Sequence, residues 1–186
     1  MILSNGKSIR TLAIAALLVG SLTAVAQTAT GVINATLINK NGISLQFDTD
    51  PAGVTLGAAG TSAANANFGV VSAFGPLSAG VTRPSVTASN FTVRTIFDVQ
   101  VVLGGNASAN YTLTANLAAA APTGFNYVVD AFTLTTGAQT IQSNGAYNTD
   151  VAHNLDLVIA TAAPGAGGPA VGTPITATIN FTATAN

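Results

Sequence analysis

Apolar and polar side chains alternate without a break along the last part of the chain, between residues 175 and 184. The apolar set is Ile175, Ala177, Ile179, Phe181 and Ala183, and the polar set is Thr176, Thr178, Asn180, Thr182 and Thr184. A period of two places one set on each face of a β-strand, and β-branched threonine suits the solvent face of a sheet. The segment therefore predicts an antiparallel strand whose apolar face packs on a core.

The same period recurs in several other segments, and no segment shows the period of a helix. Alternating apolar positions predict strands at 93–103, 111–117, 132–134 and 155–159, and shorter strands are predicted at 31–38, 43–47 and 67–72. The dipeptides at 41–42, 104–105 and 144–145 (Asn-Gly, Gly-Gly and Asn-Gly) suit tight hairpins because they tolerate positive φ. Longer loops are predicted at 50–53 and 164–169, and at the Ala/Gly-rich stretches 57–66 and 118–122.

Eight to ten short strands in one domain-sized chain are typical of a two-sheet sandwich. We therefore expect an all-β fold, an immunoglobulin-like antiparallel β-sandwich of about 8–10 strands. Cysteine is absent from the sequence. The stability of the fold must then come from core packing and sheet hydrogen bonds.

The first 26 residues have the three parts of a secretory signal peptide. Lys7 and Arg10 precede an apolar run at 11–25, which ends in Ala24-Val25-Ala26. Signal peptidase accepts a small residue at the first and third positions of the three residues before the cleavage site, as in this tripeptide. The apolar run of about 15 residues is short for a membrane span, which needs roughly 20. We expect a signal peptide at 1–26, cleaved to leave a single all-β domain at 27–186. That domain is expected to be secreted or to lie at the cell surface, with no membrane span.

Charge is scarce in the expected mature chain. Its basic residues are Lys40, Arg83 and Arg94, against six aspartates and no glutamate. No basic patch exists to neutralise phosphates, which excludes nucleic acid as a partner. A surface built from neutral Thr, Asn and Ser gives little protection against self-association. Such a surface suits a protein that assembles or coats something.

The sequence offers little for catalysis. His153 is the only histidine; Asp156, three residues away in a strand, points to the opposite face, and Asp150 would need a turn to approach it. No Gly-x-Ser-x-Gly elbow occurs, and a glycosidase pair would have to come from aspartates that lie near turns. We predict no enzyme, no catalytic residue, no cofactor and no metal ligand.

Two kinds of ligand site stay open at this stage. Asp48-Thr49-Asp50 begins like a calcium loop, although Ala59 stands where an EF-hand loop needs glutamate. Asp48 and Asp50 are then either ligands of a looser calcium site or parts of an Asp-rich turn. Tyr127 and Tyr147, near predicted loops, are candidates for stacking on sugar rings, whereas Tyr111 falls on a core face.

Four segments resemble the spore coat protein U group and related pilin-like secreted bacterial proteins. They are Ala29-Thr-Gly-Val-Ile-Asn-Ala-Thr-Leu, Ala66-Asn-Phe-Gly-Val-Val, Asn110-Tyr-Thr-Leu-Thr-Ala and Thr176-Ala-Thr-Ile-Asn-Phe-Thr-Ala-Thr. Members typically carry cysteines, which this chain lacks. The resemblance implies an immunoglobulin-like sandwich at the cell surface, sometimes polymerised by donation of one strand to a neighbour.

These observations together predict a non-enzymatic, secreted structural or adhesive protein, such as a pilin-like or matrix subunit. The alternative is an extracellular carbohydrate- or calcium-binding module. The segment 30–38 carries Ile33, Ala35 and Leu37 on one face, opposite Val32, Asn34, Thr36 and Ile38. We predict that this strand mediates subunit contacts; the alternative is the edge strand of a monomer. Other surface proteins and carbohydrate are further expected partners.

Overall fold

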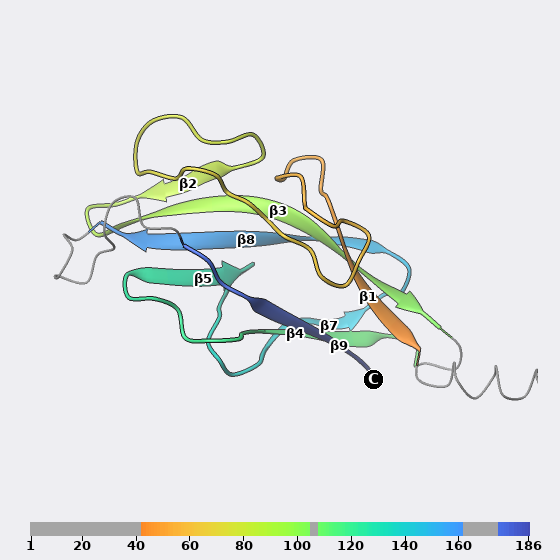
Figure 1. Ribbon diagram of the computed structural model, residues 1–186. Coiled ribbons are helices and arrows are strands. Elements are labelled where there is room, and N and C mark those ends of the chain that lie inside the picture. Colours follow the sequence, from red (N-terminus) through yellow and green to blue (C-terminus); the bar gives the residue numbers. More distant parts are fainter. Residues whose placement is uncertain (1–41, 105–107, 162–174) are drawn as a thin grey trace, which may run out of the picture.

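The computed structural model describes residues 42–104, 108–161 and 175–186, and within these ranges it contains strands and no helix (Figure 1). The strands are β1 (Ile43–Asp48), β2 (Thr82–Val86), β3 (Asn90–Leu103), β4 (Tyr111–Leu117), β5 (Phe125–Val129), β6 (Phe132–Thr133), β7 (Gln139–Gly145), β8 (Asp150–Ala160) and β9 (Ile179–Ala185). The all-β prediction is confirmed.

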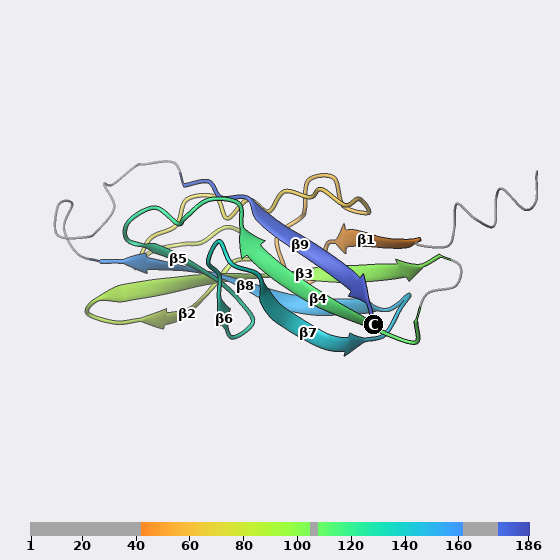
Figure 2. The same cartoon turned by 90° about the horizontal axis from the view of Figure 1, so that it is seen from below.

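Two antiparallel sheets pack face to face. The larger has the order β1-β3-β8-β5-β6, with β2 also paired to β3, and the smaller has the order β7-β4-β9. Figure 2 shows the small sheet lying across the underside of the large one. The arrangement is that of a β-sandwich, as predicted.

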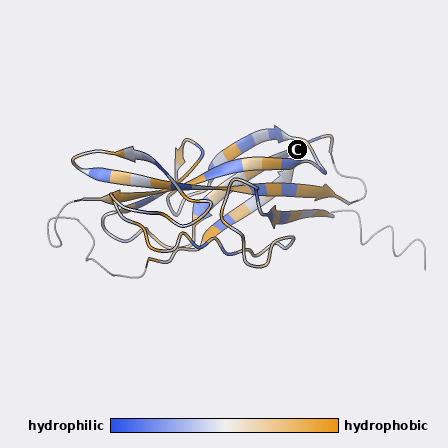
Figure 3. Cartoon of the chain, turned by 90° about the horizontal axis from the view of Figure 1, so that it is seen from above, coloured by the Kyte–Doolittle hydropathy of each residue, from blue (hydrophilic) through white to orange (hydrophobic). Residues whose placement is uncertain are grey.

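The core lies between the two sheets and follows the predicted alternation. On β4, every second residue from Tyr111 to Leu117 is buried, and on β3 the buried set includes Val93, Thr95, Phe97, Val99 and Val101. Figure 3 shows the resulting hydrophobic and hydrophilic bands along the strands. Burial of these faces removes apolar area from water, which is the main force holding the sheets together.

Three aromatic rings join the sheets where β1, β3 and β9 meet. The ring centroids of Phe47 and Phe181 lie 5.3 Å apart, those of Phe97 and Phe181 5.6 Å apart, and those of Phe47 and Phe97 6.2 Å apart. Edge-to-face pairs at such distances contribute about 0.5–1.5 kcal/mol each beyond area burial. Phe181 therefore faces the core, as its place in the alternating segment predicted.

The predicted hairpin at Asn144-Gly145 is wrong, because both residues lie inside β7. Asn144 has a φ of 55°, and pairing of β7 with β4 is irregular near this point. A Cβ added to Gly145 would lie 2.3 Å from Cζ of Tyr111. The glycine is thus required for close packing of an aromatic ring against the backbone, and not for a turn.

Other boundaries also differ from the predictions. Residues 67–72 are irregular and form no strand, and the final strand begins at Ile179 although the alternation begins at residue 175. Phe132 is 41% exposed while Leu134 is buried, and Leu103 at the end of β3 is exposed. The turn at 50–53 and the loops at 57–66 and 118–122 are confirmed. The predicted signal peptide, the strand at 31–38, the turns at 41–42 and 104–105 and the loop at 164–169 fall wholly or partly outside the described residues.

Candidate functional site

Strand β9 has one edge that pairs with β4 and one edge that no described strand covers. The amide of Ala118 donates to the carbonyl of Thr178, and the amide of Asn186 donates to the carbonyl of Asn110. Hydrogen-bonded pairs alternate along an antiparallel ladder, so the even-numbered residues of β9 bond to β4. The backbone groups of Ile179, Phe181 and Ala183 therefore point outward, away from β4.

The edge of the large sheet next to β9 belongs to β1, and it is only partly covered. The amide of Phe47 donates to the carbonyl of Thr61, and the amide of Gly60 donates to the carbonyl of Phe47. The same alternation turns the backbone groups of Ile43 and Leu45 outward, beyond this short contact. Two sheet edges thus lie side by side with unpaired backbone groups in the described part of the chain.

A groove of about 930 Å³ runs beside these edges. Its walls come from residues 62–68 and 175–181, and its floor includes Phe47, Phe97, Leu155 and Leu157. Two of these floor residues belong to the aromatic cluster that joins the sheets. The groove therefore exposes part of the sandwich core next to an unpaired strand.

Tyr127 also lines the groove, and it is 6% exposed. Its hydroxyl is buried and has no hydrogen-bond partner among the described residues. Burial raises the pKa of this hydroxyl, since the charged form loses its hydration. A buried hydroxyl without a partner costs free energy, so this position favours an occupant that supplies one.

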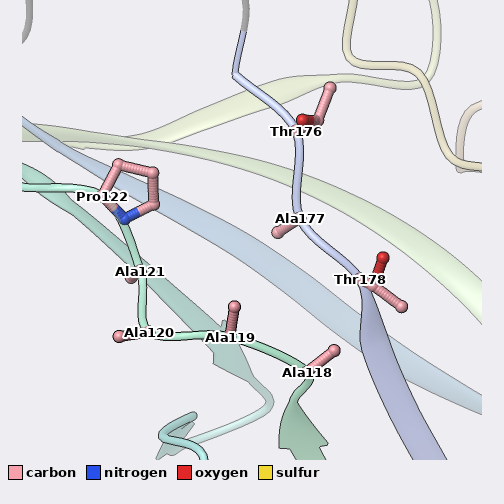
Figure 4. Close-up of a pocket in the computed structure, with 8 residues that line it drawn as sticks. All are labelled: Ala118, Ala119, Ala120, Ala121, Pro122, Thr176, Ala177 and Thr178. Carbon is pink, nitrogen blue, oxygen red and sulfur yellow. The ribbon is translucent and has the colours of Figure 1, made fainter.

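A second, smaller pocket adjoins the start of β9 (Figure 4). It has a volume of about 270 Å³ and is lined by residues 118–122 and 176–178. Its lining is alanine, proline and threonine, without a charged group, and Thr176–Thr178 also line the larger groove. The uncovered region therefore continues along the segment that leads into β9.

The tyrosines proposed for sugar stacking are turned toward the protein. Tyr127 is buried, and Tyr147 is half-buried with its ring 5.4 Å from that of Tyr111. The Tyr147 hydroxyl donates to the carbonyl of Asn110 at 3.0 Å. Neither ring is free to stack on a sugar at the surface. Tyr111 lies on the core face, as predicted.

His153 lies within β8 on the core face and is 3% exposed. Its Nδ1 is 2.8 Å from Oδ2 of Asp130, and Oδ1 of Asp130 accepts the amide of Asn154 at 2.9 Å. Nε2 is buried and has no hydrogen-bond partner among the described residues. No described hydroxyl is therefore placed to be activated by this imidazole. The contact between Asp130 and His153 instead holds the turn after β5 against β8.

The aspartates near His153 in sequence do not join it. Asp156 points to the opposite face, as predicted, and accepts two hydrogen bonds from Arg94 at 2.6 and 2.7 Å. This bidentate contact raises the pKa of Arg94. Asp150 accepts a hydrogen bond from Gln100. The sequence alone missed Asp130 as the partner of His153, because the two are 23 residues apart.

Asp48 ends β1, where it lies opposite Asp98 of β3, and Asp50 begins the turn that follows. Oδ1 of Asp50 accepts the amide of Ala52 at 2.7 Å, which is the turn geometry that aspartate favours. Burial and the charges of Asp50, Asp150 and Asp48 raise the pKa of Asp98. Among the described residues, no three or more histidine, cysteine, aspartate or glutamate side chains form a group that could hold a metal ion.

The raised pKa of Asp98 predicts how stability depends on pH. A carboxyl group whose pKa is higher in the folded state binds its proton more tightly there than in the unfolded chain. Protonated Asp98 therefore stabilises the fold fully at pH values below 3.8, the pKa of the carboxyl group in the unfolded chain. This contribution is lost as pH rises through the higher pKa of the folded state. We therefore expect Asp98→Asn to raise the denaturation midpoint at pH 7 and to leave it unchanged near pH 3. A midpoint lowered at pH 7 would contradict this assignment.

Comparison with known proteins gives no relative: no family model, no curated protein and no solved structure matches the chain. Within the described ranges, no helix is long and apolar enough to cross a membrane. The open edge of β9 and the groove beside it are thus the features on which a function has to be argued.

Proposed function

We propose that this chain is a non-enzymatic, secreted structural or adhesive protein, such as a pilin-like or matrix subunit, and that its copies join by strand addition. In this proposal, residues 30–38 of one copy pair with the β9 edge of another. The observation that carries the proposal is the outward-pointing backbone of Ile179, Phe181 and Ala183 beside a groove whose floor is formed by core residues. Pairing of an extended segment with such an edge gives affinity through main-chain hydrogen bonds and specificity through side-chain pockets.

The length and pattern of the segment support this pairing. β9 has seven residues, and the segment 30–38 is long enough to lie along all of them. Its face of Ile33, Ala35 and Leu37 is apolar, as is the floor of the groove. Entry of this face would cover the exposed part of the core and would pair the outward amides of β9.

Pairing of residues 30–38 with β1 of the same chain is less favourable, because the register of that hairpin would turn Ile33, Ala35 and Leu37 away from the core. A two-residue turn at 41–42 would place residue 38 opposite Leu45 and residue 36 opposite Phe47. Leu45 and Phe47 pack against the core, so Thr36 and Asn34 would face the core together with Val32 and Ile38, while the wholly apolar face of Ile33, Ala35 and Leu37 would face solvent. The edge at Phe47 is also already bonded to Thr61 and Gly60. The β9 edge imposes no such register.

Deletion of residues 27–38 tests the proposal. We expect the intact protein to form species larger than a monomer in light scattering at high concentration, and we expect the deletion variant to lack them. A synthetic peptide with the sequence of residues 29–39 should bind the deletion variant and raise its thermal stability, because it binds the folded state only. The matched control is the same peptide with Ile33 and Leu37 replaced by aspartate. Intact protein that stays monomeric would refute the proposal.

A further inference from the structure

Tyr127 lies near the start of β9, at one end of the groove. The amide of Leu134 donates to the carbonyl of Tyr127, and the amide of Leu117 donates to the carbonyl of Thr135. Leu117 in turn lies opposite Ile179, the first residue of β9. The buried tyrosine hydroxyl without a partner among the described residues therefore belongs to the end of the groove where β9 begins.

The other end of the groove is aromatic. Phe181 packs there on Phe97, with the ring centroids 5.6 Å apart. Phe97 lies opposite His153 of β8. Tyr127 lies opposite Leu157, four residues further along β8, and a strand rises by about 3.3 Å per residue. The groove thus has two unlike ends roughly 13 Å apart, one with aromatic rings and the other with an unpaired hydroxyl.

The segment proposed for strand addition also has two unlike ends. Its apolar face consists of Ile33, Ala35 and Leu37, and the next residue on that face is Asn39. A side-chain amide can both donate and accept a hydrogen bond, so it suits a hydroxyl whose own partner is missing. The face is therefore apolar along most of its length and polar at its C-terminal end.

We propose that Asn39 of one copy hydrogen-bonds the Tyr127 hydroxyl of another, and that this contact fixes the direction and register of strand addition. The inference rests on the proposed function, because it concerns the same groove. Asn39 ends the added segment, whereas Tyr127 lies where β9 begins. The contact therefore requires the segment and β9 to run antiparallel, as the strands of the small sheet already do. It also removes the cost of a buried hydroxyl without a partner.

The register follows from the faces of β9. Its odd-numbered residues turn their backbone groups to the open edge and pack on the core, and residues directly opposite in an antiparallel ladder share a face. Ile33 then lies opposite Phe181, over the aromatic rings. Counting on from this pair sets Asn39 opposite Ile175, at the Tyr127 end of the groove. A shift of two residues moves Asn39 away from the hydroxyl, and a shift of one turns the apolar face to solvent.

A parallel strand fits the groove less well. It would bring Gln27, a polar residue at the other end of the same face, to the hydroxyl. Ala29 and Gly31 would then lie over the floor of the groove in place of Ala35 and Leu37. That arrangement covers less apolar area and so gives less stabilisation.

A double-mutant cycle on the full-length mature protein tests the contact. We expect Asn39→Leu and Tyr127→Phe each to weaken self-association about tenfold in analytical ultracentrifugation, because each leaves a buried polar group without its partner. The double variant should associate no more weakly than either single variant. Tyr127→Phe should keep the thermal stability of the monomer, since the hydroxyl has no partner among the described residues. Asn126→Leu, on the exposed face of β5, is the matched control and should associate like the original protein.

Cross-linking tests the register, and the absence of cysteine from the chain leaves only the engineered thiols to react. A mixture of the Asn34→Cys and Asn180→Cys variants should form disulfide-linked dimers on oxidation, because these positions lie opposite each other on the solvent face in the antiparallel register. A mixture of the Asn34→Cys and Thr182→Cys variants should not.

The outcomes separate this inference from the proposed function. Self-association that neither Asn39→Leu nor Tyr127→Phe weakens, or losses that add up in the double variant, would overturn the inference and leave strand addition in place. Cross-links to position 182 instead of 180 would do the same, since they require another direction or register. Full-length protein that does not self-associate would overturn both, because the contact exists only between copies.

Discussion

Replacement of Tyr111 by alanine is expected to lower the free energy of unfolding by about 3–5 kcal/mol, the range for loss of a large buried aromatic side chain. Tyr111 is fully buried, and its ring packs on Gly145 and on Tyr147. Removal of the ring leaves a cavity that the backbone of Gly145 cannot fill, because a glycine has no side chain to move. Denaturant titration measures the loss.

The control for this prediction is Tyr111→Phe, which keeps the ring and removes only the hydroxyl. That hydroxyl donates to Oε1 of Gln142 at 3.2 Å, a long hydrogen bond. We expect a cost of about 0.5–1.5 kcal/mol, as for loss of one typical hydrogen bond. Equal losses in the two variants would mean that the ring contributes little, and would contradict the position assigned to it in the core.

Proline at two neighbouring positions of β9 should affect the stability of the domain very differently. Proline lacks an amide hydrogen and is tolerated in a strand only where that hydrogen would face away from the sheet. The amide of Thr182 bonds to β4, so Thr182→Pro should cost at least about 1–3 kcal/mol. The amide of Ala183 faces the open edge, so Ala183→Pro should leave the domain close to its original stability.

Assembly, unlike stability, should be impaired by Ala183→Pro, because this substitution removes one of the amide donors that point outward from the edge of β9. We expect this variant to stay monomeric in light scattering at concentrations where the original protein forms larger species. A strongly destabilised Ala183→Pro variant would contradict the alternation assigned to β9. A stable variant that assembles normally would separate assembly from this edge.

The fold could be predicted from the sequence wherever alternation is strict. β4 matches the predicted face because Leu113 and the other buried residues alternate with threonine and asparagine, and β8 matches because Leu155, Leu157 and Ile159 recur with a period of two. The apolar residues of the segment 67–72 are typical of a strand, but Gly69, which lies between Phe68 and Val70, has a φ of +65° that is outside the β region. Asn144-Gly145 was mistaken for a hairpin because a glycine required by the packing of Tyr111 has the same sequence signature as one required by a turn.

The candidate site was less accessible to sequence analysis than the fold. The partner of His153 and the neighbours of Asp98 come from distant strands, and only the strand order brings them together. The open edge of β9 depends on which strands do not pair, and no local pattern encodes that.

Amide hydrogen exchange on β9 tests strand addition most directly. In dilute protein, the amides of Asn180, Thr182 and Thr184 should exchange slowly because they bond to β4, and those of Phe181 and Ala183 should exchange quickly. At a concentration where larger species form, the amides of Phe181 and Ala183 should become protected as well. Assembly that leaves these two amides unprotected, or protection that is already complete in the monomer, would contradict the account.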